Sequence, residues 1–209
     1  MLRVGITGDM GAGKTWISKL FEALGVEVFN CDRESKWLIL NNPALIEGIK
    51  KEFGNHIYDV TANVFKELGK IIFVEGDKTK LNRLMEIVAP HLTRTLGYFY
   101  DRNKDKGFCL VESAVLFEYG MEEDLDRIIY VSASYSVRLA RTMKRDGITE
   151  QQYKTRMEGQ MNRMDKIAQS RFLIVNDGKP TDLLQHRVSK IYKFLNNENE
   201  KNNGATDSE

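Results

Sequence analysis

Residues 2–25 read LRVGITGDMGAGKTWISKLFEALG, a short apolar run, then a cluster of glycines, then a stretch with helical periodicity. The apolar run 2–7 is typical of a short buried strand, and the apolar residues of 14–24 recur at the spacing of a helix. Gly25 follows as a residue that commonly ends a helix. The stretch therefore predicts a strand, a glycine-rich loop and a helix in immediate succession.

The glycine cluster carries a phosphate-binding motif. Gly8, Gly13, Lys14 and Thr15 complete the pattern G-x-x-x-x-G-K-[S/T], in the strand-to-helix setting that this motif requires. Glycines allow backbone N–H groups to turn inward, and the helix N-terminus adds partial positive charge, so the loop can hold a polyphosphate. Lys14 would reach the β- and γ-phosphates, and the Thr15 hydroxyl would ligate Mg²⁺. A plain glycine turn is the alternative, and the lysine and threonine argue against it.

We expect nucleoside triphosphate binding at this loop. The residues expected to contact the nucleotide are Gly8, Gly11, Ala12, Gly13, Lys14, Thr15 and Trp16. A GTPase is disfavoured, because the segment NKDK at 103–106 places its aspartate one position too early for the guanine-reading pattern N-K-x-D, and the chain contains no D-x-x-G. GTPases, ATPases and small-molecule kinases share the loop, so the second substrate must be sought elsewhere.

Four further apolar runs, at 26–30, 108–113, 127–133 and 171–177, have the composition of parallel strands buried on both faces. Helical segments separate them, which predicts an α/β fold with a five-stranded parallel sheet in three layers.

Two regions lie outside that core. Residues 43–105 form a predominantly helical insertion, in which we expect Pro90 to interrupt or kink a long helix and in which KIIFV at 70–74 is ambiguous between strand and helix. The last residues, 197–209, are polar and poor in apolar side chains, so we expect a disordered tail.

Composition excludes several classes of protein. The 209 residues include 31 Lys and Arg against 30 Asp and Glu, so no global charge favours nucleic acid or a membrane surface. Cys31 and Cys109 are far apart and form no C-x-x-C motif, which gives no disulfide framework or zinc site. No stretch approaches the roughly 18 apolar residues of a membrane span, and the N-terminal apolar run is too short for a signal peptide. We expect a cytoplasmic protein.

Polar side chains follow several of the expected strands, at the edge where open parallel sheets bind ligands. Asp32 follows the second strand and is either the base or orienting acceptor for an attacking hydroxyl, or a helix N-cap. Glu112 ends the third strand and either binds Mg²⁺ through water or caps the strand. Asn176 and Asp177 follow the last strand.

An arginine-rich stretch precedes the last strand. Arg138, Arg141 and Arg145 lie three and four residues apart on one helix face, and the basic character continues to Arg156 and Arg163. These arginines form either a solvated basic face or a lid that neutralises the transferring phosphoryl group over bound ATP.

The motifs together resemble the dephospho-CoA kinase family, in order through nearly the whole chain. The segments that carry the resemblance are GITGDMGAGKT (5–15), VFNCD (28–32), SAVLFE (113–118), VRLARTMKRDGIT (137–149), EGQM (158–161) and FLIVNDG (172–178). The resemblance implies a P-loop kinase fold whose core comprises 1–42, 106–140 and 164–196. It also implies a helical domain at 43–105 for the coenzyme A moiety and a lid at 141–163.

The resemblance also implies a reaction, in which the γ-phosphate of ATP moves to the 3′-hydroxyl of dephospho-CoA in the presence of Mg²⁺. Asp32 would be the base, Lys14 and Arg141 would act on the phosphates, Asn176 would lie near the adenine, and Thr15 and Glu112 would serve the metal. We expect a monomer or weak homo-oligomer. A nucleoside or nucleotide kinase on the same core is the alternative enzyme, and a non-catalytic ATP-binding module is the alternative from another class.

Four positions depart from the family pattern. Asn30 replaces the first aspartate of D-x-D, Ala89 takes the place of a histidine, and Ala114 replaces a proline. Asp9 replaces a glycine within the loop and brings a negative charge close to the phosphates, which is tolerable only if its side chain points outward. The first three concern the acceptor side.

Overall fold

The computed structural model describes residues 1–59, 61, 63–72, 78–158, 160–178 and 180–206. The chain divides into two compact units. The first comprises Met1–Asn30 and Arg102–Glu209, and the second comprises Cys31–Asp101. The second unit therefore begins earlier than the expected boundary at residue 43 and ends earlier than residue 105.

The first unit is built on a parallel sheet. Within the described residues its strands are β1 (Leu2–Thr7), β2 (Val28–Asn30), β3 (Phe108–Glu112), β4 (Arg127–Ser132) and β5 (Phe172–Val175). They lie in the order β2-β3-β1-β4-β5, and every neighbouring pair is parallel. The prediction of a five-stranded parallel α/β sheet is confirmed. Glu112, at the carboxyl end of β3, pairs in register with Ile6 of β1 and Asn30 of β2.

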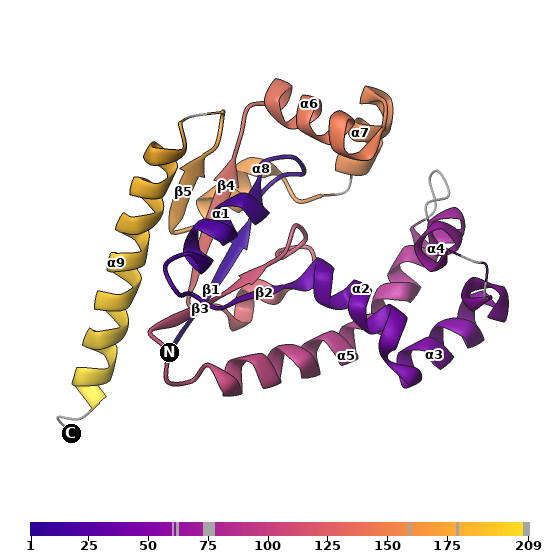
Figure 1. Cartoon of the computed structure of the whole chain (residues 1–209), viewed down its shortest axis with the longest axis horizontal. Helices are drawn as coiled ribbons and strands as arrows, with labels where there is room; N and C mark the ends of the chain where they lie inside the picture. The colour runs from indigo at the N-terminus through magenta and orange to yellow at the C-terminus, as the bar shows by residue number, and fades with distance from the viewer. Residues whose placement is uncertain (60, 62, 73–77, 159, 179, 207–209) are drawn as a thin grey trace. The chain divides into compact units, whose positions relative to one another are not determined.

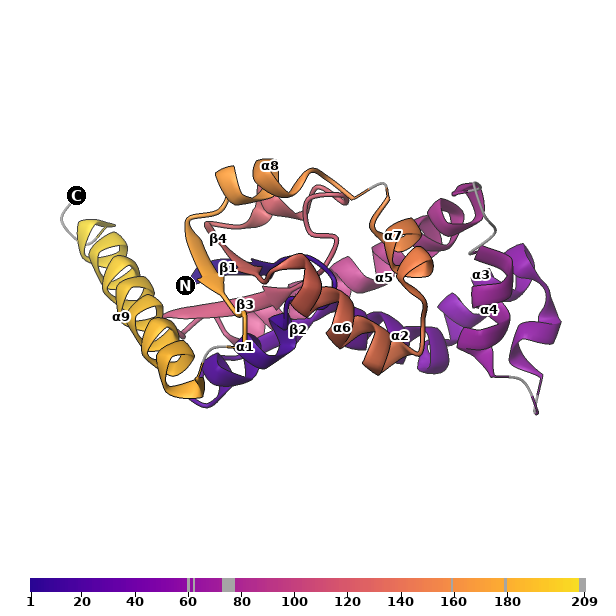
Figure 2. The same cartoon turned by 90° about the horizontal axis from the view of Figure 1, so that it is seen from above.

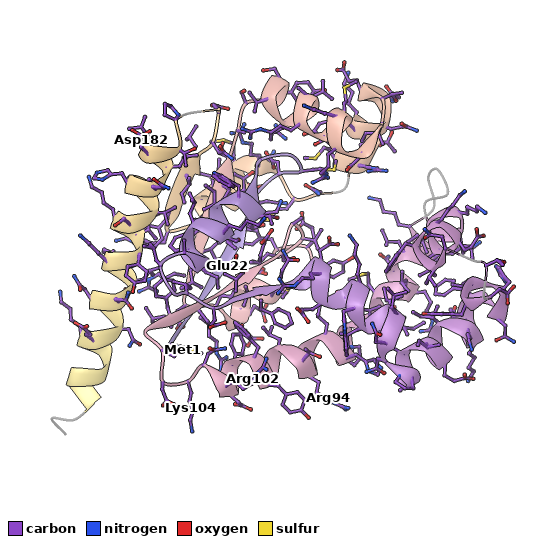
Figure 3. All side chains as sticks on the ribbon, viewed as in Figure 1. Met1, Glu22, Arg94, Arg102, Lys104 and Asp182 are labelled. Carbon is purple, nitrogen blue, oxygen red and sulfur yellow. The ribbon has the colours of Figure 1, made fainter. Side chains whose placement is uncertain are left out.

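Helices cover both faces of the sheet (Figure 1). The helical elements of this unit within the described residues are α1 (Lys14–Glu22), the 3₁₀ turn η2 (Met121–Asp124), α6 (Tyr135–Asp146), α7 (Glu150–Met157), α8 (Arg163–Ala168) and α9 (Thr181–Thr206). Helices α1 and α9, whose charged Glu22 and Asp182 are labelled in Figure 3, pack on one face and share the main core with the strands. Helix α8 lies on the other side of the sheet from α1 (Figure 2).

The main core follows from the sequence pattern. Helix α1 contributes Ile17, Leu20 and Phe21, and the strands contribute residues such as Ile6 and Val131. Because the strands are covered on both faces, they read as continuous apolar runs rather than as an alternation of apolar and polar residues. A smaller cluster around Leu116, Phe117 and Ile128 fills the opposite face.

The second unit is helical and has a core of its own. Its elements are α2 (Cys31–Asn41), α3 (Pro43–Phe53), the 3₁₀ turn η1 (Asn55–Tyr58), α4 (Val64–Ile72) and α5 (Thr79–Arg102), the last of which continues into the first unit. Leu38 and Ile39 of α2 pack into this core with Leu45 of α3, which explains why the unit includes α2. The Asn42 side chain accepts a hydrogen bond from the Leu45 N–H and caps α3.

The structure bears on three further sequence expectations. Helix α5 runs through Pro90 without interruption. Of the ambiguous segment 70–74, residues 70–72 belong to α4, where Ile72 is buried with Leu68, and 73–74 lie outside the described residues. The expected disordered tail is helical as far as Thr206, and residues 207–209 lie outside the described part.

The extension of α9 has a physical cause. Its apolar face packs on the sheet through Leu184, Val188, Ile191 and Leu195, so the following polar residues continue a helix that is already nucleated. The Arg127 guanidinium also donates to the Glu198 carboxylate, which ties the polar continuation to β4. Across the described residues, none of the helices combines the length and apolar character that a bilayer crossing demands.

Candidate functional site

The loop between β1 and α1 has the backbone geometry of an anion-binding site. Gly8, Gly11 and Gly13 have φ values of 150°, 83° and 90°, conformations that residues with a Cβ rarely adopt. Gly13 is the N-cap of α1, and no side chain caps the helix. The first N–H groups of α1 are therefore available to an anion together with the positive end of the helix dipole.

The same glycines allow the loop to lie directly against its neighbours. A Cβ on Gly8 would stand 2.1 Å from the Val131 carbonyl oxygen, and one on Gly11 would stand 2.4 Å from the Arg138 carbonyl oxygen. A Cβ on Gly13 would stand 2.3 Å from the Asn176 Nδ2 atom. The loop is thus fitted closely to β4, α6 and the end of β5, and none of these contacts leaves room for a side chain.

Lys14 begins α1 and reaches back over the loop. Its Nζ donates to the carbonyl oxygens of Gly8 at 2.8 Å and Asp9 at 3.4 Å. Burial lowers the pKa of Lys14 to about 8, while the carboxylates of Glu112 and Asp9 act in the opposite direction. A bound polyphosphate would add negative charge beside Nζ and favour its protonated form.

Thr15 and Glu112 lie together, as the sequence predicts for a shared metal site. The Thr15 hydroxyl donates to Glu112 Oε1 at 2.7 Å, and Glu112 is buried at the end of β3. Hydroxyl and carboxylate oxygens are ligands that suit Mg²⁺. The described part of the chain holds no cluster of three or more His, Cys, Asp or Glu side chains able to form an all-protein metal site. A pair of oxygens beside a phosphate loop fits a metal whose other ligands are water and phosphate.

Arg141 and Asn176 connect the loop to α6 and β5. Asn176 Nδ2 donates to the Ala12 carbonyl at 2.9 Å. The Arg141 guanidinium donates to the Asn176 carbonyl at 2.9 Å and to the Gly11 carbonyl at 3.5 Å. No carboxylate of the described residues forms an ion pair with Arg141, so its charge faces only carbonyl oxygens beside the loop. Trp16, in the first turn of α1, is 46% exposed.

The Asp9 side chain does not point outward, the one arrangement that the sequence suggests would tolerate its charge beside phosphates. It is 2% exposed and hydrogen-bonded to the Tyr130 hydroxyl at 2.7 Å. Its Oδ2 atom lies 3.2 Å from the Arg138 guanidinium and 3.6 Å from that of Arg163. Burial raises the pKa of Tyr130, and its hydrogen bond to Asp9 raises it further, which keeps the phenol a proton donor.

The arginine-rich stretch divides into two groups. Arg145 and Arg156 both pair with Asp146 and are about half exposed, as a solvated face would be. Arg138 is buried beneath the loop. Sequence reasoning did not identify Tyr130 or Tyr153 as residues of the site, because an isolated tyrosine distant in sequence from the loop carries no signal.

Asp32 lies in the second unit, in the first turn of α2. Its side chain is 80% exposed and accepts a hydrogen bond from Lys36 Nζ at 2.9 Å. Because α2 begins at Cys31, Asp32 is inside the helix and is not its N-cap. Its role as a base stays a prediction.

Comparisons with known proteins agree on one family. The family model for dephospho-CoA kinase matches residues 2–182. A dephospho-CoA kinase of Chlorobaculum tepidum is 34% identical over 202 residues, covering 93% of this chain and 95% of the relative. One of Salinibacter ruber is 31% identical over 195 residues, covering 92% and 96%.

Solved structures agree on the fold. The protein TT1252 from Thermus thermophilus superposes with a TM-score of 0.78 at 24% identity, covering 91% of this chain and 95% of the other. A dephospho-CoA kinase from Campylobacter jejuni gives 0.68 at 20% identity, covering 94% and 98%. Shikimate kinase from Acinetobacter baumannii gives 0.51 at 16% identity, covering 93% of each chain. The P-loop kinase fold expected from the sequence is confirmed.

Replacing Gly11 by alanine tests the close approach of the loop to α6. We expect Gly11→Ala to lower the free energy of unfolding by about 1–3 kcal/mol more than Gly25→Ala does, because the new Cβ overlaps the Arg138 carbonyl. Gly25 is the matched control, since its φ of 84° is nearly the same but a Cβ there has nothing within 4 Å. Urea denaturation of both variants measures the difference, and equal losses would contradict the contact.

Proposed function

The chain belongs to the dephospho-CoA kinase family, and from that membership we propose how its residues divide the transfer of the γ-phosphate of ATP to the 3′-hydroxyl of dephospho-CoA. In this reaction an oxygen–phosphorus bond forms at the acceptor, the bond between the β,γ-bridging oxygen and the γ-phosphorus breaks, and ADP leaves. The products are coenzyme A and ADP. The observation that carries the proposal is the loop of residues 8–15, whose glycine geometry and Lys14 suit a triphosphate.

The phosphates would be held from two sides. Lys14 would exchange its carbonyl partners for oxygens of the β- and γ-phosphates, as the equivalent lysine of this motif does. Arg141 already lies against the loop, and its acceptors among the described residues are the carbonyls of Gly11 and Asn176, so a phosphate oxygen would give it a charged partner. Charge-assisted hydrogen bonds of this kind are stronger than the neutral ones they replace. The side chain of Asn176 would stay on Ala12 and keep the adenine side of the site in place.

Mg²⁺ would be held by the Thr15 hydroxyl, with Glu112 acting directly or through a bound water. The metal would supply charge neutralisation on the phosphates. Glu112 accepts a hydrogen bond from the Thr15 hydroxyl, so the two oxygens already lie side by side. The protein's contribution is to hold this pair at the end of β3 and the start of α1.

We propose that residues of the second unit bind and activate the acceptor. Asp32 would accept the proton of the attacking 3′-hydroxyl, and its side chain is 80% exposed, so a substrate hydroxyl can reach it. We propose that the helical region expected at 43–105 receives the coenzyme A moiety and that 141–163 acts as a lid over the phosphates. Cytoplasmic location and a monomeric or weakly associating state stay predictions.

Mass spectrometry of dephospho-CoA incubated with the protein, ATP and Mg²⁺ tests the acceptor. A mass gain of one phosphate at the ribose, lost when Mg²⁺ is chelated, is the expected result. A panel of nucleosides and nucleotides is run in parallel, and turnover of one of these in preference to dephospho-CoA would support the alternative kinase. ATP binding without any phosphorylated product would support a non-catalytic module.

Removing either positively charged side chain of the phosphate site, Lys14 or Arg141, should abolish most turnover. We expect Lys14→Ala and Arg141→Ala each to reduce kcat by about a thousandfold, because phosphoryl transfer depends on charge neutralisation at the γ-phosphate. Lys144→Ala removes one positive charge from an exposed position of the same α6 helix and should leave kcat unchanged. Steady-state kinetics measure the effect, and circular dichroism checks the fold. Near-normal turnover in either variant would remove that residue from the mechanism.

Asp32→Asn separates acceptor chemistry from ATP binding. We expect ATP affinity to persist while kcat falls about 10²–10⁴-fold, because the amide cannot accept the hydroxyl proton. Glu34→Gln, in the same first turn of α2, is the control and should keep normal kcat. Isothermal titration with ATP and single-turnover transfer measure the two quantities. Normal transfer by Asp32→Asn would show that Asp32 serves only its ion pair with Lys36.

A further inference from the structure

A buried carboxylate lies inside the phosphate loop itself. Asp9 contributes backbone to the loop, yet its side chain turns into the protein and contacts three different elements. Tyr130 comes from β4, Arg138 from α6 and Arg163 from the start of α8. Burying a carboxylate is costly unless charged or hydrogen-bonding partners surround it. The Asp9 carboxylate therefore has the charged and hydrogen-bonding partners that its burial requires.

These contacts close into a ring that begins and ends in the loop. The buried guanidinium of Arg138 contacts Asp9, and its NH1 donates to the Tyr153 hydroxyl at 2.9 Å. That hydroxyl, on α7, donates to the carbonyl of Met10 at 3.3 Å. Arg138 Nε donates to the Ala133 carbonyl at 3.0 Å, which fixes the guanidinium from behind. Two consecutive loop residues are thus attached to α6 and α7 through one arginine and one tyrosine.

The second guanidinium differs from the first. The Arg163 side chain is 42% exposed, and besides Asp9 it contacts the Ser132 hydroxyl at the end of β4. Asp9 therefore anchors one buried arginine that belongs to the framework and one half-exposed arginine at the carboxyl edge of the sheet. Ligands bind at that edge in folds of this kind.

The charge balance gives two opposite expectations for the loss of this carboxylate. One negative charge meets two positive ones, so the cluster carries a surplus of one positive charge beside the phosphate loop. If Asp9 acted on the nucleotide only through its charge, removing that charge would strengthen the binding of a triphosphate. If Asp9 holds the loop in place, its loss would weaken binding, because Arg138 would stay buried without a counterion and the loop would lose its attachment.

We propose that Asp9 is a positioning residue, which through Arg138, Tyr153 and Arg163 holds the phosphate loop in the shape that receives the triphosphate. This inference rests on the proposed function only in taking the loop as the ATP site. Asp9 does not touch the substrate. Its carboxylate neutralises the buried guanidinium of Arg138, which belongs to α6 and donates a hydrogen bond to Tyr153 of α7.

The test is the ATP affinity of Asp9→Asn, which keeps the side-chain shape and removes the charge. We expect the Kd for ATP, measured by isothermal titration, to rise about tenfold or more, since small displacements of positioning groups have effects of this size. We expect the KM for dephospho-CoA to stay the same. An unchanged or lower Kd for ATP would overturn the proposal. Wild-type protein that binds no ATP would instead overturn the proposed function.

Two companion variants separate positioning from stability. Val188→Ala destabilises the buried core from α9, which supplies none of the Asp9 contacts described above, and should leave the Kd for ATP unchanged. The double variant Asp9→Asn with Arg138→Met removes both buried charges, so it should recover thermal stability relative to Asp9→Asn without recovering ATP affinity. Recovery of both quantities together would show that Asp9 is needed only to neutralise Arg138 and would overturn the positioning role.

A milder variant keeps the proposal testable if Asp9→Asn does not fold. Tyr153→Phe deletes only the hydroxyl that joins Arg138 to the Met10 carbonyl. Two hydrogen bonds are lost, of which one reaches the loop, and we expect the loss of that one to raise the Kd for ATP about threefold. Tyr135→Phe is the control, because its hydroxyl donates to the exposed Glu150 and makes no loop contact. Equal affinities of Tyr153→Phe and Tyr135→Phe would contradict the attachment of the loop to α7.

Discussion

The close approach of the loop backbone to its surroundings is the constraint on which the rest of the site depends. Three glycines of the loop meet backbone or side-chain atoms of β4, α6 and Asn176 at distances that no Cβ tolerates. This approach lets Asn176 and Arg141 hydrogen-bond to the loop carbonyls. A loop held from behind in this way can present its N–H groups and Lys14 to an anion without first being ordered by it, which reduces the entropic cost of binding.

Electrostatics around the loop follow from the same packing. Lys14 is half-buried and desolvation lowers its pKa, while the carboxylates of Glu112 and Asp9 partly oppose that shift. Glu112 is turned toward Thr15, whereas Asp9 is turned toward Arg138 and away from solvent. Two carboxylates near one phosphate site thus have different partners. The first suits a metal, and the second compensates for a buried arginine, so neither needs to face a phosphate unscreened.

The family and the fold extend across both units, since the family model matches residues 2–182. Membership in the family does not by itself assign a role to each residue. On the acceptor side, Asn30, Ala89 and Ala114 replace the residues that the family pattern has at those positions. The helical unit has its own core, centred on α2, α3, η1, α4 and α5, so it can carry an acceptor function on a separate framework.

The sequence alone determined the phosphate loop, the five parallel strands and the family, because each is encoded locally by periodicity, by glycine spacing or by ordered motifs. It also indicated the pair Thr15 and Glu112, since the carboxyl ends of neighbouring parallel strands meet at one edge. Helix α9 was only partly predicted, because local composition favours disorder beyond Leu195 and only packing on the sheet and the Arg127 contact extend the helix.

Only the tertiary structure decided the role of Asp9. From the sequence its negative charge beside phosphates was tolerable only with an outward-pointing side chain and had no assigned role, whereas in the structure this side chain is 2% exposed. Its partners Tyr130, Arg138 and Arg163 are more than a hundred residues away. The arginine pattern allowed a place near the phosphates, but nothing in it indicates an ion pair with Asp9. The role of a charged side chain depends on the counterions beside it. For Asp9 these counterions come from distant parts of the chain, so only the folded structure shows them.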